Sequence, residues 1–219
     1  MAHRTIPRRW RIAVAAGLLL PSAAFAQTTN ISRTVGPGQT DLMTVPLIAD
    51  PTNAFGALAA NVPAGTAVYF YDPGLSVFAG GSKSAKGWPA SISNRLVLPG
   101  ESFFLSAEWT AGHVMTIQGE VPSGPVTNQV NERWSALGYP FPDEVPWTDT
   151  SLASNLPPGT LVYFWDLTNQ QYDTLFKGLE TRGGWGAEGS NHLIRPGDGF
   201  LVRQPSGSAP FLWIQERGE

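Results

Sequence analysis

The sequence predicts an all-β protein built from two tandem homologous antiparallel units, sandwich- or barrel-like, with only short helical turns. Three observations support this. The 219 residues include 24 Gly and 19 Pro, and 11 % are aromatic, which is typical of many short strands joined by tight turns. A segment of roughly ninety residues occurs twice. The apolar runs inside each copy are short and are bounded by Pro-Gly turns.

The first 26 residues have the three parts of a secretory signal peptide. A stretch with four arginines precedes the apolar run IAVAAGLLL at 12–20, and Ala24-Phe25-Ala26 offers the small-x-small cleavage pattern. This run is too short to cross a hydrocarbon core of about 30 Å. We therefore expect cleavage after Ala26 and a secreted chain, extracellular or periplasmic, that is not an integral membrane protein. An uncleaved anchor or a buried helix is the alternative.

Charge and cysteine content exclude several classes of function. Removing residues 1–26 takes four of the 14 Lys and Arg residues and none of the 17 Asp and Glu residues, so the mature chain carries a formal charge of −7. No basic cluster follows Arg11, so we expect no nucleic-acid partner. Cysteine is absent, which excludes disulfides, thiolate zinc sites and cysteine nucleophiles.

The repeat emerges when the chain is compared with itself at an offset of 94 residues. NVPAGTAVYFYD (61–72) then matches NLPPGTLVYFWD (155–166) at eight of twelve positions. At an offset of 97, SNRLVLPGESFFL (93–105) matches SNHLIRPGDGFLV (190–202), and Ile117-Gln118 meets Ile214-Gln215. We therefore divide the chain into a signal peptide at 1–26, a first β unit at 27–121 and a second at 122–219.

Each unit is expected to contain the same elements in the same order. A Pro-x-Gly-Thr turn precedes a strand, 67–72 or 161–166, which a hairpin connects to a return strand. A second Pro-Gly turn starts another strand near 103 or 200, and 113–121 or 210–217 closes the unit. Short helical turns are expected within 53–61 and 148–155, the latter capped by Thr148.

Apolar side chains occupy both parities of the strand after the Pro-x-Gly-Thr turn. Val68 and Phe70 belong to one face, and Tyr69 and Tyr71 to the other. A strand that is apolar on both faces is typical of the interior of a sheet packing. We therefore expect both faces to be covered, by the other copy or by loops.

Residues that recur in both copies are predicted to support the fold. The glycines and prolines belong to tight turns, and the aromatic residues to the core. The predicted structural residues are Gly65, Tyr69, Trp88, Pro99, Gly100, Gly159, Tyr163, Trp185, Pro196 and Gly197. The alternative for the two recurring tryptophans is a pair of glycan sites, since an exposed indole can stack on a sugar ring. These sites would pair Trp88 and Trp185 with Asp72 and Asp166, or with Glu101 and Asp198.

With these motifs placed, the unit resembles a repeat of uncharacterised secreted bacterial β-repeat proteins. The matching motifs are Val45-Pro46-Leu47, Gly65-Thr66, Gly87-Trp88, Pro99-Gly100-Glu101 and Gly119-Glu120-Val121 in the first copy, and Gly159-Thr160, Trp165-Asp166, Gly183-Gly184-Trp185 and Pro196-Gly197-Asp198 in the second. The resemblance covers nearly all of the mature chain. It departs at Thr44, where the pattern has Asn, and at Tyr71, where it has Trp. It implies export and a β fold, and it implies no activity or catalytic residue.

Candidate ligand-binding residues are those in which the copies differ. Trp109, Trp134, Trp147 and Trp213 have no tryptophan at the matching position. Trp109 and Trp147 lie near predicted loop ends, where a side chain can contact a partner. The second copy also has three more residues in the loop after the strand that ends at Asp166. We therefore select Trp109, Trp147 and Asp166 as ligand-binding candidates, and both a protein and a glycan partner stay open.

Catalytic assemblies find little support. His113 and His192 are the histidines beyond the signal peptide, and the chain has neither a Gly-x-Ser-x-Gly elbow nor an HExxH motif. The segment DLTNQQYD (166–173) lacks the alternating acids and the central glycine of a calcium loop. We therefore predict no catalytic residue, no metal and no cofactor. The preferred function is an exported, non-catalytic structural or interaction module that binds, adheres or assembles. The alternatives are a carbohydrate-binding protein and, with less support, a secreted hydrolase with two carboxylates.

Overall fold

Antiparallel sheets form most of the structure, a computed structural model that describes residues 27–107, 111–182 and 184–218. Strands account for 44 % of the residues and helices for 13 %, and no sheet in the described part closes into a barrel. The all-β prediction is therefore confirmed, and the arrangement is sandwich-like. Within the same residues, no helix is both long and apolar enough to cross a membrane. The predicted signal peptide lies outside the described residues.

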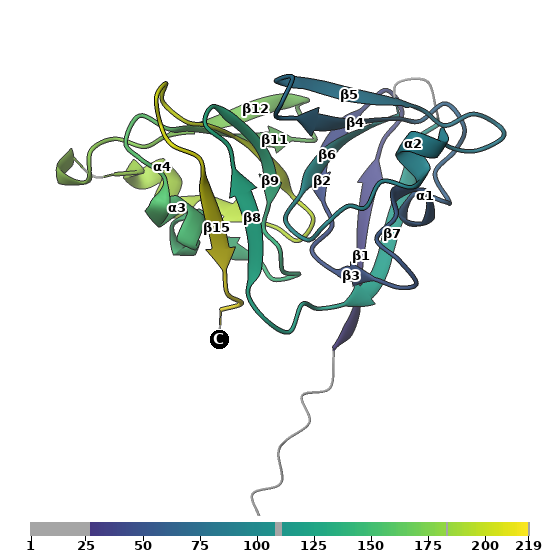
Figure 1. Cartoon of the computed structure of the whole chain (residues 1–219), viewed down its shortest axis with the longest axis horizontal. Helices are drawn as coiled ribbons and strands as arrows, with labels where there is room; N and C mark the ends of the chain where they lie inside the picture. Colours follow the sequence, from purple (N-terminus) through teal and green to yellow (C-terminus); the bar gives the residue numbers. More distant parts are fainter. Residues whose placement is uncertain (1–26, 108–110, 183, 219) are drawn as a thin grey trace, which may run out of the picture.

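The elements follow one another in a similar order in the two halves of the chain (Figure 1). The first half contains β1 (Thr28–Val35), β2 (Thr40–Thr44), β3 (Ile48–Ala49), α1 (Phe55–Leu58), β4 (Ala67–Asp72), β5 (Val77–Ser82), α2 (Ala90–Ser93), β6 (Ser102–Ser106) and β7 (His113–Glu120). The second contains β8 (Val126–Val130), β9 (Trp134–Gly138), β10 (Val145–Pro146), η1 (Trp147–Asp149), α3 (Ser151–Asn155), β11 (Leu161–Asp166), β12 (Gln171–Phe176), η2 (Glu180–Arg182), α4 (Gly186–Asn191), β13 (Leu193–Ile194), β14 (Gly199–Arg203) and β15 (Phe211–Gln215).

Each half has one four-stranded antiparallel sheet. The order is β2-β6-β4-β5 in the first and β9-β14-β11-β12 in the second. In the first sheet Phe70 is paired with Phe103, and in the second Phe164 is paired with Phe200. A further antiparallel pair, β1 with β7 or β8 with β15, accompanies each sheet. In Figure 1 the helices lie at the two flanks of the molecule, and β4, β5, β11 and β12 lie at the top.

Aromatic rings fill the inner face of both sheets. In the first half Phe55 contacts Phe70 and Phe103, with ring centroids 5.3 Å apart in each pair. In the second half Trp147 takes the corresponding position, 5.5 Å from both Phe164 and Phe200. Edge-to-face contacts of this kind are favourable beyond the area that they bury. Each core therefore has one large aromatic side chain at its centre, and this residue is the first of a short helix.

The recurring tryptophans stabilise the ends of these short helices. The indole Nε1 of Trp88 donates to the carbonyl oxygen of Ala59 at 3.2 Å, and that of Trp185 donates to Ala153 at 3.0 Å. The Nζ of Lys177 also donates to the Ala153 carbonyl, at 2.9 Å. Carbonyl groups at a helix C-terminus have no partner within the helix, so these side chains satisfy acceptors that would otherwise be unpaired.

Two details of the sequence interpretation are wrong. Thr150, not Thr148, caps α3, since its Oγ1 accepts from the Ala153 N–H at 3.1 Å. The match of Ile117 with Ile214 is one residue out of register: Ile117 is buried, whereas Ile214 is 52 % exposed, so the two side chains face in opposite directions. A shift of one residue in a strand moves every side chain to the other face.

Close contacts join the two sheets where β2 and β6 meet β9 and β14. The N–H of Thr44 donates to the Gly197 carbonyl at 2.9 Å, and the N–H of Gly138 donates to the Gly100 carbonyl at 3.0 Å. A Cβ at Gly138 would collide with the Thr44 side chain. The Pro-Gly turns, in which Gly100 and Gly197 have positive φ angles of 86° and 88°, therefore fix the junction between the halves.

Candidate functional site

A continuous row of seven aromatic rings crosses the outward faces of both sheets. We call it the aromatic row. Successive ring centroids lie 4.8 to 5.9 Å apart, and the order is Tyr71, Phe78, Phe104, Trp165, Tyr172, Tyr163 and Trp134. Six of these side chains are half-buried, and Tyr172 is 38 % exposed. The row therefore offers a rigid surface that solvent reaches in part.

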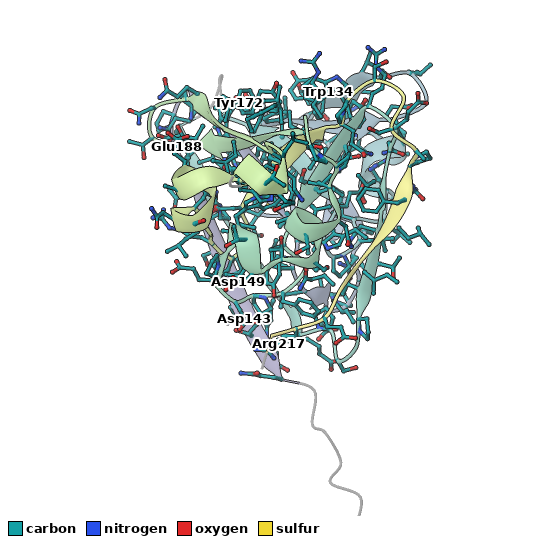
Figure 2. The ribbon with its side chains drawn as sticks, turned by 90° about the vertical axis from the view of Figure 1, so that its left-hand side faces the viewer. Trp134, Asp143, Asp149, Tyr172, Glu188 and Arg217 are labelled. Atoms are coloured by element: carbon teal, nitrogen blue, oxygen red, sulfur yellow. The ribbon has the colours of Figure 1, made fainter. Side chains whose placement is uncertain are left out.

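The alternation of side chains along the strands places the row. In β11 Val162 and Phe164 point into the core, so Tyr163 and Trp165 point outward. The expectation that both faces of this strand are covered is therefore correct for the inner face, whereas the outward face is covered only in part, with Tyr163 and Trp165 half-buried. Figure 2 shows Trp134 of β9 and Tyr172 of β12 together at the upper end of the molecule, away from Asp143 and Arg217.

The row crosses the junction between the halves at Trp165. Its ring lies 5.9 Å from that of Phe104 in the first sheet, and its indole Nε1 donates to the Thr40 carbonyl at 2.6 Å. Gln170 adds two hydrogen bonds to the backbone of Thr40, at 2.8 and 3.1 Å. These contacts fix the orientation of the two sheets, and thereby of the rings that they carry.

A buried ion-pair cluster lies behind the junction. Two nitrogens of Arg33 donate to the two carboxylate oxygens of Asp41, each at 3.0 Å, and a third donates to Asp198 at 2.6 Å. The Asp41 side chain is fully buried, and Asp198 is 28 % exposed. Burial raises the pKa of Asp41, an effect that the Arg33 guanidinium opposes. Arg33 thus joins β1 in the first half to the turn at Pro196-Gly197 in the second half.

A polar cavity of about 520 Å³ opens next to this cluster. Its charged and aromatic lining combines residues from the end of β11, from β12, from the segment before β14 and from β1. These residues are Arg33, Phe164, Trp165, Asp166, Asp173, His192, Arg195 and Asp198. Trp165 belongs to both the cavity and the aromatic row, so the two are contiguous.

His192 lies against the core at the wall of the cavity. Its ring centroid is 3.8 Å from that of Phe164, and burial lowers the pKa of His192 from its ordinary value of 6.5. The side chain is therefore neutral at pH 7. A neutral imidazole presents one hydrogen-bond donor and one acceptor.

Asp166 lines the cavity and also organises the turn that follows β11. Its Oδ1 accepts from the N–H groups of Thr168 and Asn169 at 2.8 and 3.0 Å, and its Oδ2 accepts from the Asn169 side chain at 2.6 Å. These hydrogen bonds, led by the one from the Asn169 backbone, lower the pKa of Asp166. The structure therefore places this predicted ligand-binding residue at the cavity, with its charged form stabilised by these hydrogen bonds.

The first half has a smaller hollow in the corresponding place, of about 260 Å³. Here Arg95 covers the Phe70 ring, as His192 covers Phe164, and it is ion-paired with Glu101. Leu98 stands where the second half has Arg195. The two halves therefore differ in charge and in volume at equivalent positions.

Of the remaining predicted ligand-binding residues, Trp147 does not join this site. Trp147 is fully buried between Phe164, Trp185 and Phe200, so the prediction that it contacts a ligand at a loop end is wrong. Its position just before a predicted helix concealed that it fills the core. Trp109 lies outside the described residues.

Of the recurring residues, some support the fold as predicted and one lies on the surface. Trp88 and Trp185 pack against the core, and Gly65 and Gly159 have positive φ angles of 94° and 89° at the turns where the sequence places them. Tyr69, expected to be structural, is instead 41 % exposed on the outward face.

Sequence reasoning missed Trp134, Trp165 and Tyr172 as site residues. The signal available for Trp165 was the alternation in β11, where aromatic residues occupy the positions between the core residues. Among the residues that the structure describes, no group of three or more His, Asp or Glu side chains could hold a metal ion. Comparisons with protein-family models, with curated proteins and with solved structures find no match for this chain. The resemblance to secreted β-repeat proteins therefore stays a prediction.

Proposed function

We propose that this chain is an exported, non-catalytic binding module that holds a carbohydrate chain on its aromatic row. The observation that carries the proposal is the contact of seven rings across both outward sheet faces. The C–H groups on the face of a pyranose ring can stack on an aromatic ring, and an extended row offers successive stacking positions to an extended chain. Tyr and Trp provide such contact area with little loss of side-chain entropy.

The location of the rings supports this proposal. All seven lie on or at the ends of strands within the two sheets, and rigid elements hold a binding surface better than loops do. The indole of Trp165 is fixed by its hydrogen bond to Thr40. The row therefore needs little ordering when a ligand binds, which favours affinity.

The engagement of the carboxylates supports a non-catalytic role. Asp41 and Asp198 both accept hydrogen bonds from Arg33, and Asp166 accepts three within its own turn. A general acid in a glycosidase needs a raised pKa and access to substrate. The pKa of Asp166 is lowered, and Asp41, whose pKa is raised by burial, is fully buried behind Arg33. Export is proposed from the basic, apolar and small-residue segments of 1–26.

The proposal is tested with the full chain expressed with its own leader and recovered from the exported fraction. Co-sedimentation with insoluble cellulose, chitin and xylan measures binding, and release of reducing ends in the same samples measures hydrolysis. Trp134→Ala and Tyr172→Ala remove rings from the row. Leu212→Ala and Ile214→Ala are matched controls, because these β15 side chains are 59 % and 52 % exposed and belong to no ring contact of the row.

We expect the wild type and the two controls to sediment with at least one polysaccharide, and the two row variants to stay in solution. Reducing ends should not increase. Failure of the wild type to bind any of them, or equal binding by the row variants, would contradict the carbohydrate proposal. A rise in reducing ends would contradict the non-catalytic role.

A further inference from the structure

We infer that the polar cavity between the halves is a subsite for one neutral sugar unit of the chain that the aromatic row holds. This inference rests on the proposed function and adds a place and a ligand class to it. The cavity is lined by Asp166, Asp173, His192, Arg195 and Trp165, and the Arg33–Asp198 ion pair also lines it.

The first argument is continuity with the row. Trp165 contacts Phe104 and Tyr172 in the row and also lines the cavity. A chain stacked along the row therefore reaches the cavity without leaving the surface. The volume of about 520 Å³ lies within the range of about 300–1,000 Å³ that is usual for small-molecule sites.

The second argument is the presence of uncommitted polar groups. In the described structure, neither the Asp173 carboxylate nor the Arg195 guanidinium makes a hydrogen bond or an ion pair with another residue. Arg195 offers donors, Asp173 offers acceptors, and neutral His192 offers one of each. A sugar hydroxyl both donates and accepts, so this mixture matches the hydroxyl groups at the edge of a pyranose ring.

The third argument concerns charge. Two arginines and three aspartates line the cavity, and buried Asp41 adds a further carboxylate behind Arg33. The cavity therefore carries an excess of negative charge, which repels an anionic ligand. A neutral sugar fits this balance, whereas a uronic acid would bring its carboxylate close to Asp166 and Asp173.

The fourth argument is the contrast with the first half. Its equivalent hollow has half the volume, Leu98 replaces Arg195, and Arg95 is already paired with Glu101. Among the described residues that line this hollow, the first half therefore offers neither an unpaired carboxylate nor a guanidinium free of an ion pair. The subsite is expected beside Trp165 and not beside Tyr71 at the end of the row, so a bound chain should have a fixed direction.

The test uses the exported chain and soluble hexasaccharides of glucose, N-acetylglucosamine and xylose, with a galacturonate hexasaccharide as the charged probe. Titration calorimetry gives Kd for the wild type, Asp173→Asn and Arg195→Gln. Asp149→Asn is the matched control, because it makes the same change at an exposed aspartate of η1 that lies away from the upper end of the molecule (Figure 2). Both cavity side chains are exposed, so the variants should fold, which thermal unfolding checks.

We expect each cavity variant to weaken binding of the best neutral hexasaccharide about tenfold, the usual effect of losing one hydrogen bond to a charged group. Asp149→Asn should leave Kd unchanged, and the galacturonate probe should bind more weakly than the neutral ones. If the row variants lose binding but both cavity variants keep the wild-type Kd, or if galacturonate binds best, the subsite is refuted and the row stands. If the wild type binds no neutral hexasaccharide, the subsite and the proposed function both fail.

Discussion

Replacing Arg33 by methionine should destabilise the protein strongly, although the residue lies at the periphery of one sheet. The substitution keeps an unbranched apolar stem and removes the guanidinium that donates to Asp41 and Asp198. The Asp41 carboxylate, which is fully buried, then has no cation near it and can only remain charged at high cost or take up a proton.

The two carboxylates should contribute unequally to the loss. Removing one partner of a buried ion pair usually costs about 3–5 kcal/mol, and the Arg33–Asp41 pair, with its two hydrogen bonds, fits that case. Asp198 is 28 % exposed and also accepts from the Arg195 N–H, so water and that backbone donor compensate in part. We expect Asp198→Asn to cost no more than about 1 kcal/mol.

The double variant Arg33→Met/Asp41→Leu separates electrostatics from packing. It removes both charges at once, and such replacements are often close to neutral, so the double variant should lie within about 1 kcal/mol of the wild type. Urea unfolding followed by tryptophan fluorescence measures all four proteins, and an unchanged slope with urea shows that the comparison is valid. If Arg33→Met lost less than about 1 kcal/mol, or if the double variant were as unstable as the single one, the cluster would not act as a buried ion pair.

Three further predictions concern the core, the histidines and the junction. Trp147→Ala should cost about 3–5 kcal/mol in urea unfolding, since it empties the centre of the second core; an unchanged midpoint would contradict its placement. Burial lowers the pKa of both His113 and His192 from 6.5, so the unfolded chain takes up protons first, and stability should fall as the pH drops below about 6.5. The double variant with glutamine at both positions should show a flatter pH profile between pH 7 and 5, and an identical profile would refute the assignment. The valine side chain of Gly138→Val should collide with Thr44 and push the two sheets apart, which should lower the melting temperature. Gly124 has open space around it, so Gly124→Val should leave the melting temperature unchanged.

The sequence predicts the core strands well because their local chemistry is unambiguous. β4 and β11 follow Pro-x-Gly-Thr turns and are rich in β-branched and aromatic residues, which favours strands irrespective of context. The Pro-Gly turns before β6 and β14 are equally local signals. These elements needed no knowledge of the partner strand.

The strands β1, β2, β8 and β9 were not predicted from the sequence. In β1 an arginine occupies an inward position between Ile31 and Val35, which breaks the apolar alternation on which strand prediction depends. Arg33 is acceptable there because Asp41 and Asp198 pair with it from other strands and turns. The contact with Asp198, which is 165 residues away in the sequence, leaves no local signal.

The candidate site depends on which face of a strand meets solvent, and this is a tertiary property. The aromatic residues of the second parity were expected to be covered, because an apolar strand face is usually packed. In the structure the two sheets approach most closely along β2, β6, β9 and β14, where Gly138 and Gly199 leave room for the contact, and Trp165 of β11 adds a contact to Phe104. Tyr163 and Tyr172 lie beyond these contacts, and they remain partly open to solvent.

Footprinting of the exported chain with hydroxyl radicals, with and without a saturating neutral hexasaccharide, bears most directly on the central claim. Mass spectrometry then reports the oxidation of each aromatic side chain. We predict that the ligand protects Trp134, Tyr172 and Trp165, and leaves the oxidation of Leu212 and Ile214 on β15 unchanged. Equal oxidation of the three row residues in both samples, at ligand concentrations that saturate the chain, would contradict the assignment of the aromatic row as the binding surface.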